Sequence, residues 1–316
     1  LPALSRAVGR PVQWTETRSE NMVNMVQGRA QQQTVRIGGT ADGRITHYSL
    51  DVVQDSGAYA EIGALLPHFT HIMTSGIYDI PNVRFTAKSV ITNTVPIGAY
   101  RGAGRPEATH AIERMVDLFA SHLGLDPVEV RRHNMISPDA FPFTTSTGAA
   151  MDSGNYQGSL DLVLDAVDYE GLRAEQVARR NDPSATSHLG IGLSTYVEIT
   201  NPMGSQEYGS MEVRPDGTAL VLTGSSSHGQ GHHTAFAQLA SGRTGIPIEH
   251  ITVRHGDTDE VPRGGGTGGS KSLQLGGSAV IQAADVVVDT AKAAAADLLE
   301  ANPADIVLDA TNGSFS

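Results

Sequence analysis

Alternating apolar and polar residues predict a β-hairpin in the first part of the chain. TVRIGGTADGRITHYSLDV holds two runs of strand type on either side of Asp42-Gly43, a dipeptide that favours tight hairpin turns. VRFTAKSVITNT alternates from Val83 to Ser89, which is typical of a half-buried strand. MEVRPDGTALVLTG predicts a second hairpin with Pro215-Asp216-Gly217 as its turn, and HITVRHGD is typical of a further strand.

Other windows repeat every three or four residues and predict helices. RPEATHAIERMVDLFASHLG opens on Pro106 and Glu107, keeps one apolar face and stops at Gly124. SLDLVLDAVDYEGLRAEQVARRN is predicted as one helix capped by Ser159. SAVIQAADVVVDTAKAAAADLLEANP, the longest apolar helix, is expected to end at Pro303.

This mixture of strands and helices predicts an α+β fold in two parts. RRNDPSATSHLG lacks periodicity and is rich in helix breakers, so we place the boundary there, with parts 1–183 and 184–316. No internal repeat is evident in the sequence. The chain starts at Leu1 rather than methionine and stops in the strand-like DIVLDATNGSFS. We therefore expect an internal fragment of a larger protein, with the second part cut short.

The composition argues against several classes of protein. The 22 basic and 34 acidic residues give a net charge of 22 − 34 = −12, which argues against nucleic acid or an anionic membrane surface as a partner. No apolar run approaches the roughly 20 residues of a membrane span. The sequence has no cysteine, which excludes disulfides, thiolate metal sites and iron–sulfur ligation by this chain and fits a cytoplasmic protein.

Glycine, at 35 of 316 residues, gathers in three loops that each precede a predicted helix. The loops are AYRGAGRPEA from Ala99, SSSHGQGHHTAF from Ser225 and GGGTGGSKSLQLGGSAV from Gly264. A helix start carries free N–H groups, and glycine lets a ligand approach the backbone closely. One such loop is commonly a plain turn. Three predict a large anionic ligand, provided the fold brings them together.

Other chemistry fits these residues less well. RGGGTGGSKS departs from a nucleotide-binding P-loop because Ser270 separates Gly269 from Lys271 and shifts the register by one residue. SSSHG lacks the G-x-S-x-G pattern of a serine hydrolase, and nothing marks an oxyanion hole. A group of histidines could supply zinc ligands: His228, His232, His233 and His255, with Asp257 nearby. The H-E-x-x-H pattern of zinc proteases is absent, and the alternative role of these side chains is to form hydrogen bonds within the loops.

No pair of carboxylates stands out as a general acid and base. Glu198, Glu207 and Glu212 have the setting of ordinary strand or loop residues. Without a spacing rule that relates them, we assign none of the three a part in proton transfer.

Taken in order along the chain, these motifs resemble the molybdopterin-binding large subunit of the molybdenum hydroxylases, the family of xanthine dehydrogenase, aldehyde oxidase and aerobic carbon monoxide dehydrogenase. The resemblance runs through GRPVQWTETRSENM, QDSGAYAEIG, YDIPNVRF, VPIGAYRGAGRPEA, VRRHNMI, GQGHHT and GDTDEVPRGGGTGGSKS. It implies an α+β molybdopterin-binding region in two subdomains, 1–183 and 184–316, with the cofactor held between them.

The resemblance also implies roles for particular residues. Arg101 would lie near the molybdenum, and the general-base glutamate would lie beyond Ser316. Molybdopterin carries its own dithiolene sulfurs, so no side chain of this chain would ligate the metal. The residues implied in cofactor binding are Ala99, Tyr100, Arg101, Gly102, Gly229, Gln230, Gly231, His233, Thr234, Thr267, Gly268, Ser270, Lys271 and Ser272. The implied walls of the substrate pocket are Phe69, Gly102 and Ala103.

The implied activity is hydroxylation of an aldehyde, an N-heterocycle or a similar small substrate with water as the oxygen source. The implied cofactor is molybdopterin with molybdenum, in its cytosine dinucleotide form, and electrons would leave through 2Fe-2S clusters and FAD on partner subunits in a dimer of heterotrimers. AYRGAGR has Gly102 where the copper type of carbon monoxide dehydrogenase carries a cysteine, so it matches the copper-free class. This fragment alone is expected to be inactive. The alternatives are carbon monoxide oxidation of the copper-free type, a glycine-loop nucleotide or phosphate-ester hydrolase, and a non-enzymatic ligand-binding module.

Overall fold

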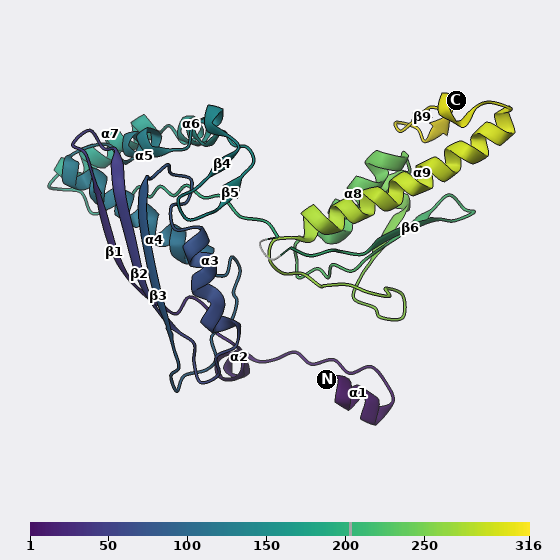
Figure 1. The fold of residues 1–316 in the computed structure, drawn as a ribbon, viewed down its shortest axis with the longest axis horizontal. Coiled ribbons are helices and arrows are strands. Elements are labelled where there is room, and N and C mark those ends of the chain that lie inside the picture. Colours follow the sequence, from purple (N-terminus) through teal and green to yellow (C-terminus); the bar gives the residue numbers. More distant parts are fainter. Residues whose placement is uncertain (202–203) are drawn as a thin grey trace. The chain divides into compact units, whose positions relative to one another are not determined.

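The hairpin predicted around Asp42-Gly43 is present in the computed structural model, which describes residues 1–201 and 204–316 (Figure 1). Strands β1 (Gln31–Gly39) and β2 (Ile45–Asp55) pair antiparallel, with an irregularity between Gly38 and Gly39. β3 (Asn82–Val90) covers the alternating segment and pairs with β2 in parallel, so the sheet has the order β1-β2-β3. The strands predicted for this part are confirmed.

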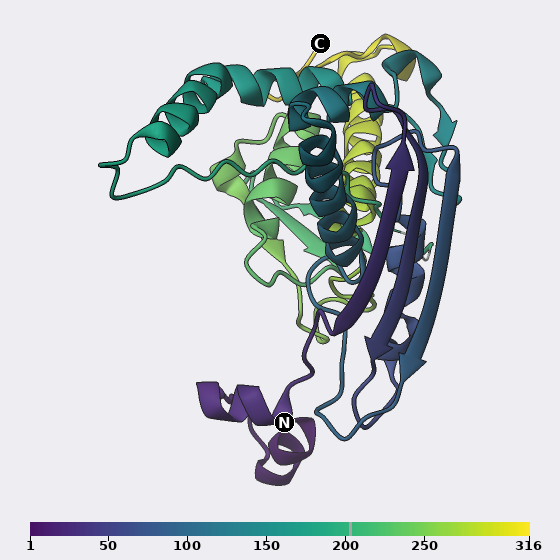
Figure 2. The ribbon, with the colours of Figure 1, turned by 90° about the vertical axis from the view of Figure 1, so that its left-hand side faces the viewer.

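Helix α4 (Arg105–Leu123) packs against this sheet (Figure 2). It begins beside Pro106 and ends at Gly124, whose φ of 70° closes the helix in the left-handed conformation, as predicted. The core joins β2 to α4 through side chains such as Tyr48, Leu50, Ile112 and Val116, all nearly inaccessible to solvent. This part also contains α1 (Pro2–Val8), α2 (Arg18–Asn24), α3 (Leu66–Ile72), α5 (Pro127–Asn134), β4 (Phe143–Thr144) and β5 (Ala150–Met151).

The single helix predicted from Ser159 is wrong, because two helices occupy that stretch. They are α6 (Tyr156–Ala166), capped by the Asn155 side chain, and α7 (Tyr169–Asn181). The break lies at Asp168, whose φ is 50° and whose carboxylate accepts a 3.2 Å hydrogen bond from the Gly171 N–H. Asp168 therefore starts a new helix where the apolar periodicity runs on without a visible stop.

The second part also begins its sheet with a β-hairpin, as predicted. β6 (Gly209–Val213) and β7 (Ala219–Thr223) pair antiparallel, and β8 (Ile251–Arg254) joins β7 in parallel. Helices α8 (His232–Thr244) and α9 (Ser278–Leu299) cover the sheet, and Val221, Phe236 and Val280 are buried between them. α9 follows a π-helical turn (Ser272–Gly277) and ends before Pro303 because Glu300 has a φ of 51°. The chain closes with the short pair β9 (Leu308–Asp309) and β10 (Ser314–Phe315).

The two sheets share one connectivity, although the sequence shows no repeat. In each, an antiparallel hairpin is followed by a helix, a parallel third strand, a glycine loop and a covering helix. The helices in question are α3 and α4 in the first part and α8 and α9 in the second. The glycine loops before α4 and α9 therefore occupy equivalent positions in the two parts.

The chain divides into two compact units, Leu1–Val197 and Glu198–Ser316. Val197 and the segment before it stay with the first unit because Arg131 donates a 3.0 Å hydrogen bond to the Leu193 carbonyl and Glu113 accepts one of 2.8 Å from the Thr195 N–H. The polar stretch used to place the boundary at 183/184 precedes these contacts. The subdomain limits named above remain a prediction.

No helix within residues 1–201 and 204–316 is long and apolar enough to cross a membrane.

Candidate functional site

Two of the three glycine loops lie against each other in the second unit. The Gly266 N–H donates a 3.1 Å hydrogen bond to the Gly224 carbonyl, and the Thr267 hydroxyl donates one of 2.5 Å to the Ser226 carbonyl. A Cβ added to Gly264 would stand 2.5 Å from the Gly224 Cα, so only glycine permits this approach. The loop before α8 and the loop before α9 thus form one surface.

A buried glutamate joins these loops, and sequence reasoning missed it. The Glu207 side chain is fully buried and accepts hydrogen bonds from the Ser225 hydroxyl (3.1 Å) and from the Tyr208 and Gly265 N–H groups (2.9 and 3.4 Å). The Lys271 ammonium lies 3.9 Å from its carboxylate, and the lysine side chain is only 12% exposed. A buried carboxylate needs such a partner. In this structure the Lys271 ammonium lies close enough to balance the charge of Glu207. The contact of Lys271 with a phosphate remains a prediction.

The outer side of the joined loops is open backbone. A Cβ added at Gly229, Gly231, Gly266 or Gly268 would meet nothing within 4 Å among the described residues. Gly231 caps α8, and no described side chain caps that helix start. Exposed N–H groups at the start of a helix attract negative charge, so this surface suits phosphate or another anion.

Polar side chains shape the two loops from within. The Gln230 side-chain oxygen accepts hydrogen bonds from the His228 N–H and the Ser227 hydroxyl, which folds the residue back onto its own loop. Thr267 and Ser272 share a 3.1 Å hydrogen bond across the second loop. Ser270 adopts a φ of 56°, a conformation that is uncommon outside glycine. These bonds fix Gln230 within the loop before α8, and Thr267 and Ser272 within the loop before α9. That these residues bind a cofactor remains a prediction.

The histidines beside these loops pack as rings. His232 is 5% exposed and stacks on Phe236 at 5.1 Å, and the His233 and His255 rings lie 4.7 Å apart. Burial lowers the pKa of His232 and of His255 below the usual 6.5, which favours neutral rings. Within the described residues no three His, Cys, Asp or Glu side chains gather closely enough to hold a metal ion. The geometry gives no support to the zinc alternative.

The third glycine loop, Ala99–Gly104, belongs to the first unit. It turns through three left-handed residues, Gly102, Ala103 and Gly104, at φ values of 90°, 40° and 88°. The Ala103 N–H donates a 2.7 Å hydrogen bond to the Tyr100 carbonyl, and the Arg105 Nε donates one of 2.7 Å to the Gly102 carbonyl. Ala99, Tyr100 and Arg101 are exposed beside this turn.

Phe69 of α3 lies next to the same loop. A Cβ on Gly104 would stand 3.0 Å from the Phe69 Cβ, and the Arg105 guanidinium lies 5.7 Å from the Phe69 ring. Phe69, Gly102 and Ala103 thus come from one neighbourhood of the first unit. That they line a substrate pocket remains a prediction.

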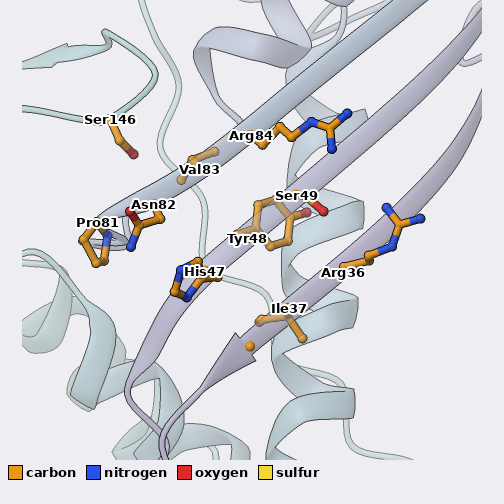
Figure 3. Close-up of a pocket in the computed structure, with 11 residues that line it drawn as sticks. Arg36, Ile37, His47, Tyr48, Ser49, Pro81, Asn82, Val83, Arg84 and Ser146 are labelled. Carbon is orange, nitrogen blue, oxygen red and sulfur yellow. The ribbon is translucent and has the colours of Figure 1, made fainter.

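A hollow elsewhere in the first unit contains none of the predicted residues (Figure 3). It crosses the β1-β2-β3 sheet, where Arg36, Ser49 and Arg84 are direct neighbours on adjacent strands. The residues lining it are Arg36, Ile37, Gly38, His47, Tyr48, Ser49, Pro81, Asn82, Val83, Arg84 and Ser146. None of the residues that line the hollow belongs to the three glycine loops.

Comparison with known proteins identifies the family. Two family profiles, both described as molybdopterin cofactor-binding domain, match residues 1–135 and 162–316. The carbon monoxide dehydrogenase large chain of Hydrogenophaga pseudoflava is 40% identical over 96% of this chain. The nicotine 6-hydroxylase large subunit of Paenarthrobacter nicotinovorans is 33% identical over 98% of it. The chain belongs to the molybdenum hydroxylase family.

Two solved structures have the same fold as this chain. Quinoline 2-oxidoreductase from Pseudomonas putida 86 matches 96% of this chain with a TM-score of 0.88 and 33% identity. A Cu,Mo-CO dehydrogenase matches 99% of it with a TM-score of 0.87 and 31% identity. The chain covers 39% of the length of each of the two curated relatives named above, and 40% and 42% of these two structures. The α+β fold predicted from the sequence is confirmed.

The joined loops have the features that molybdopterin requires of a protein. The cofactor's phosphate group needs N–H donors on a backbone that a ligand can approach, and Gly231 and Gly268 leave that approach open. The Gly229 and Gly266 N–H groups already donate to the Ser227 hydroxyl (3.3 Å) and the Gly224 carbonyl (3.1 Å). The buried Glu207 carboxylate accepts a hydrogen bond from each loop, from the Ser225 hydroxyl and from the Gly265 N–H, and so holds the two loops together. The residues present therefore fit the group for which the family is named.

Proposed function

We propose that this chain is the molybdopterin-binding part of the large subunit of a molybdenum-dependent oxidoreductase that hydroxylates a small substrate with oxygen from water. The observation that carries the proposal is the open glycine surface of the second unit, in a chain whose family is shown by both halves of its sequence. When bound, the cofactor would supply the metal centre at which the substrate is oxidised. The chain's own residues would bind it, orient it and shape its surroundings.

In the second unit, we assign the pterin end of the cofactor to Gln230, Gly231, His233 and Thr234 of the loop before α8. The phosphates are assigned to the loop before α9; its residues are Thr267, Gly268, Ser270, Lys271 and Ser272. Backbone amides carry most of this work, as expected in a chain with a net charge of −12. A cytosine nucleotide on the cofactor would extend the anionic group that these amides hold.

In the first unit, the loop Ala99–Gly104 would present Arg101 toward the ligands of the metal. The Arg101 side chain is exposed on a turn that its neighbours hold rigidly. A guanidinium placed there offers several hydrogen-bond donors to negatively charged oxygen or sulfur. The general base is not assigned to any residue of this chain.

For the substrate, we propose an N-heterocycle or an aldehyde bounded by Phe69 and Ala103. Two of the similar proteins are named for nicotine and quinoline, both N-heterocyclic compounds. Gly102 further argues against the copper type of carbon monoxide oxidation. Its φ is 90° and a Cβ there would stand 2.5 Å from the Pro106 Cγ, so the loop has no room for a cysteine.

Carbon monoxide oxidation of the copper-free type stays as the second candidate because a carbon monoxide dehydrogenase large chain is 40% identical. Partner subunits with 2Fe-2S clusters and FAD are proposed for electron transfer, in a dimer of heterotrimers. Their support is the absence of cysteine here and the naming of relatives as large chains and subunits.

The proposal is tested on the full-length protein purified with its subunits. Metal analysis should find about one molybdenum per large subunit, acid treatment should release CMP in the same amount, and quinoline or an aromatic aldehyde should be hydroxylated with oxygen from labelled water. Metal-free protein that hydrolyses ATP would favour the hydrolase alternative. Metal-free protein without any turnover would favour the binding module. Oxidation of carbon monoxide alone would favour the second candidate.

A further inference from the structure

Arg29 has a strained backbone at a place where two segments of the first unit meet. Its φ is 63°, a conformation that residues with a side chain rarely adopt and that tends to persist where function requires it. The Gln27 N–H donates a 3.0 Å hydrogen bond to the Pro96 carbonyl, and the Gly98 N–H donates one of 2.8 Å to the Gln27 carbonyl. These bonds bring residues 27–29 alongside the start of the Ala99–Gly104 loop.

The residue before Arg29 allows this close approach. A Cβ on Gly28 would stand 2.6 Å from the Tyr100 Cβ, so a larger residue would push the loop away. At Arg29 the backbone is left-handed, and the side chain contacts the Ala99–Gly104 loop. The guanidinium lies 5.0 Å from the centre of the Tyr100 ring, within the range of a cation–π contact.

The Arg29 guanidinium then binds two further groups. One nitrogen donates a hydrogen bond to the Arg101 carbonyl, and the other lies 3.0 Å from the Glu107 carboxylate. The Glu107 side chain is 6% exposed and lies in the first turn of α4, where a negative charge is favoured but, being buried, needs a partner of opposite charge. The Arg29 guanidinium therefore links Tyr100 and Arg101 to Glu107 at the start of α4.

We propose that Arg29 is a positioning residue that holds the Ala99–Gly104 loop in the conformation that presents Arg101. The inference rests on the function proposed above for Arg101. The contacts of Arg29 with the loop do not depend on that function. Lysine cannot replace Arg29 fully, because one ammonium on a flexible stem lacks the fork that reaches both the carboxylate and the carbonyl.

The experiment compares Arg29→Lys and Arg29→Ala in the full-length enzyme, with Arg36→Lys as the matched control. Arg36 is an arginine of the same unit, paired with Asp51 and 66% exposed. Amide exchange is followed at Ala103 and Arg105, whose N–H groups are hydrogen-bonded within the turn. In Arg29→Lys we expect exchange there to rise roughly fivefold to tenfold, the effect of losing one hydrogen bond, with an unchanged melting temperature. Arg36→Lys should leave both unchanged.

Kinetics provide the second readout. With the best substrate of the wild-type enzyme, Arg29→Lys should lower kcat by roughly tenfold while KM and molybdenum content stay near wild type, because only orientation is lost. Exchange and kcat equal to wild type in Arg29→Lys would overturn the inference, even if Arg29→Ala failed to fold. Should the wild-type protein contain no molybdenum, the proposed function fails, yet the exchange measurement still decides whether Arg29 holds the loop.

Discussion

Gly224 and Gly264 lie backbone against backbone, so close that a Cβ on Gly264 would stand 2.5 Å from the Gly224 Cα. This contact joins two glycine loops that are 40 residues apart in the chain, and the buried Glu207 reinforces it from behind. The candidate cofactor surface of the second unit depends on it.

Gly264→Ala should therefore separate the loops. Forcing a methyl group into this contact costs about 1–3 kcal/mol, and we expect a lower melting temperature together with a lower molybdenum content. Gly242→Ala is the control: Gly242 lies inside α8 with nothing within 4 Å of an added Cβ, so alanine should stabilise the helix by about 0.5–1 kcal/mol. Thermal unfolding and metal analysis check both variants, and an unaltered Gly264→Ala protein would contradict the contact.

Gly268→Val separates cofactor binding from folding. A Cβ at Gly268 meets no described atom within 4 Å, and the position does not need a left-handed φ, so the fold should tolerate valine. The branched side chain should nevertheless cover the backbone that we assign to a phosphate. We expect molybdenum and CMP content to fall at least fivefold while circular dichroism and melting stay near wild type. Full cofactor occupancy would show that this loop does not carry the phosphates.

The buried Arg131–Glu113 pair predicts a large effect on stability. Arg131 is fully buried, 3.0 Å from the Glu113 carboxylate, and the Tyr78 hydroxyl donates a 2.5 Å hydrogen bond to the same carboxylate. Arg131→Met leaves a buried charge and should lower the free energy of unfolding by about 3–5 kcal/mol. Arg131→Met with Glu113→Gln should recover part of the loss.

The exposed pair of Arg36 and Asp51 gives the comparison for that measurement. Arg36→Met should cost less than about 1 kcal/mol, because the arginine side chain is 66% exposed to solvent. Urea unfolding of the four proteins decides the matter. Equal losses in Arg131→Met and Arg36→Met would refute the assigned burial.

The neutral histidines predict a loss of stability on mild acidification. The pKa values of His232 and His255 are lowered by burial, so the unfolded chain binds more protons below about pH 6.5 than the folded one. Stability from these groups is therefore full above the usual value of 6.5 and is lost as the pH falls through their folded pKa values. Asp42, Asp51 and Asp55, whose pKa values are lowered from 3.8, respond only at lower pH.

Melting temperatures between pH 7.5 and pH 5.5 check this prediction. The wild-type protein should melt at a lower temperature at the acid end. His255→Leu should show a shallower dependence on pH, because one of the two rings with a lowered pKa is gone. His71, whose pKa is also lowered by burial, keeps part of the slope in both proteins. A slope unaffected by His255→Leu would contradict the assignment.

Local pattern was enough to predict much of this fold. The Asp42-Gly43 and Pro215-Asp216-Gly217 turns have residues that favour their own geometry, and Gly124 ends α4 through a φ of 70°. The break at Asp168 was missed because the apolar spacing continues across it, while a hydrogen bond from the carboxylate to the Gly171 N–H starts the next helix. A side-chain cap that starts a new helix within an apolar repeat does not change the spacing of the apolar residues, so the spacing does not reveal it.

By itself the sequence determined the α+β class, the three glycine loops, the family resemblance and the absence of thiol chemistry, because these follow from residue type and from neighbours along the chain. Only the tertiary structure decided which loops meet. Glu207 and Arg29 look ordinary in the sequence, yet each binds a backbone group from a distant segment: Glu207 accepts from the Gly265 N–H, and Arg29 donates to the Arg101 carbonyl. Such contacts depend on the packing of sheets and helices, which carries distant residues to within hydrogen-bond range and which no local pattern encodes.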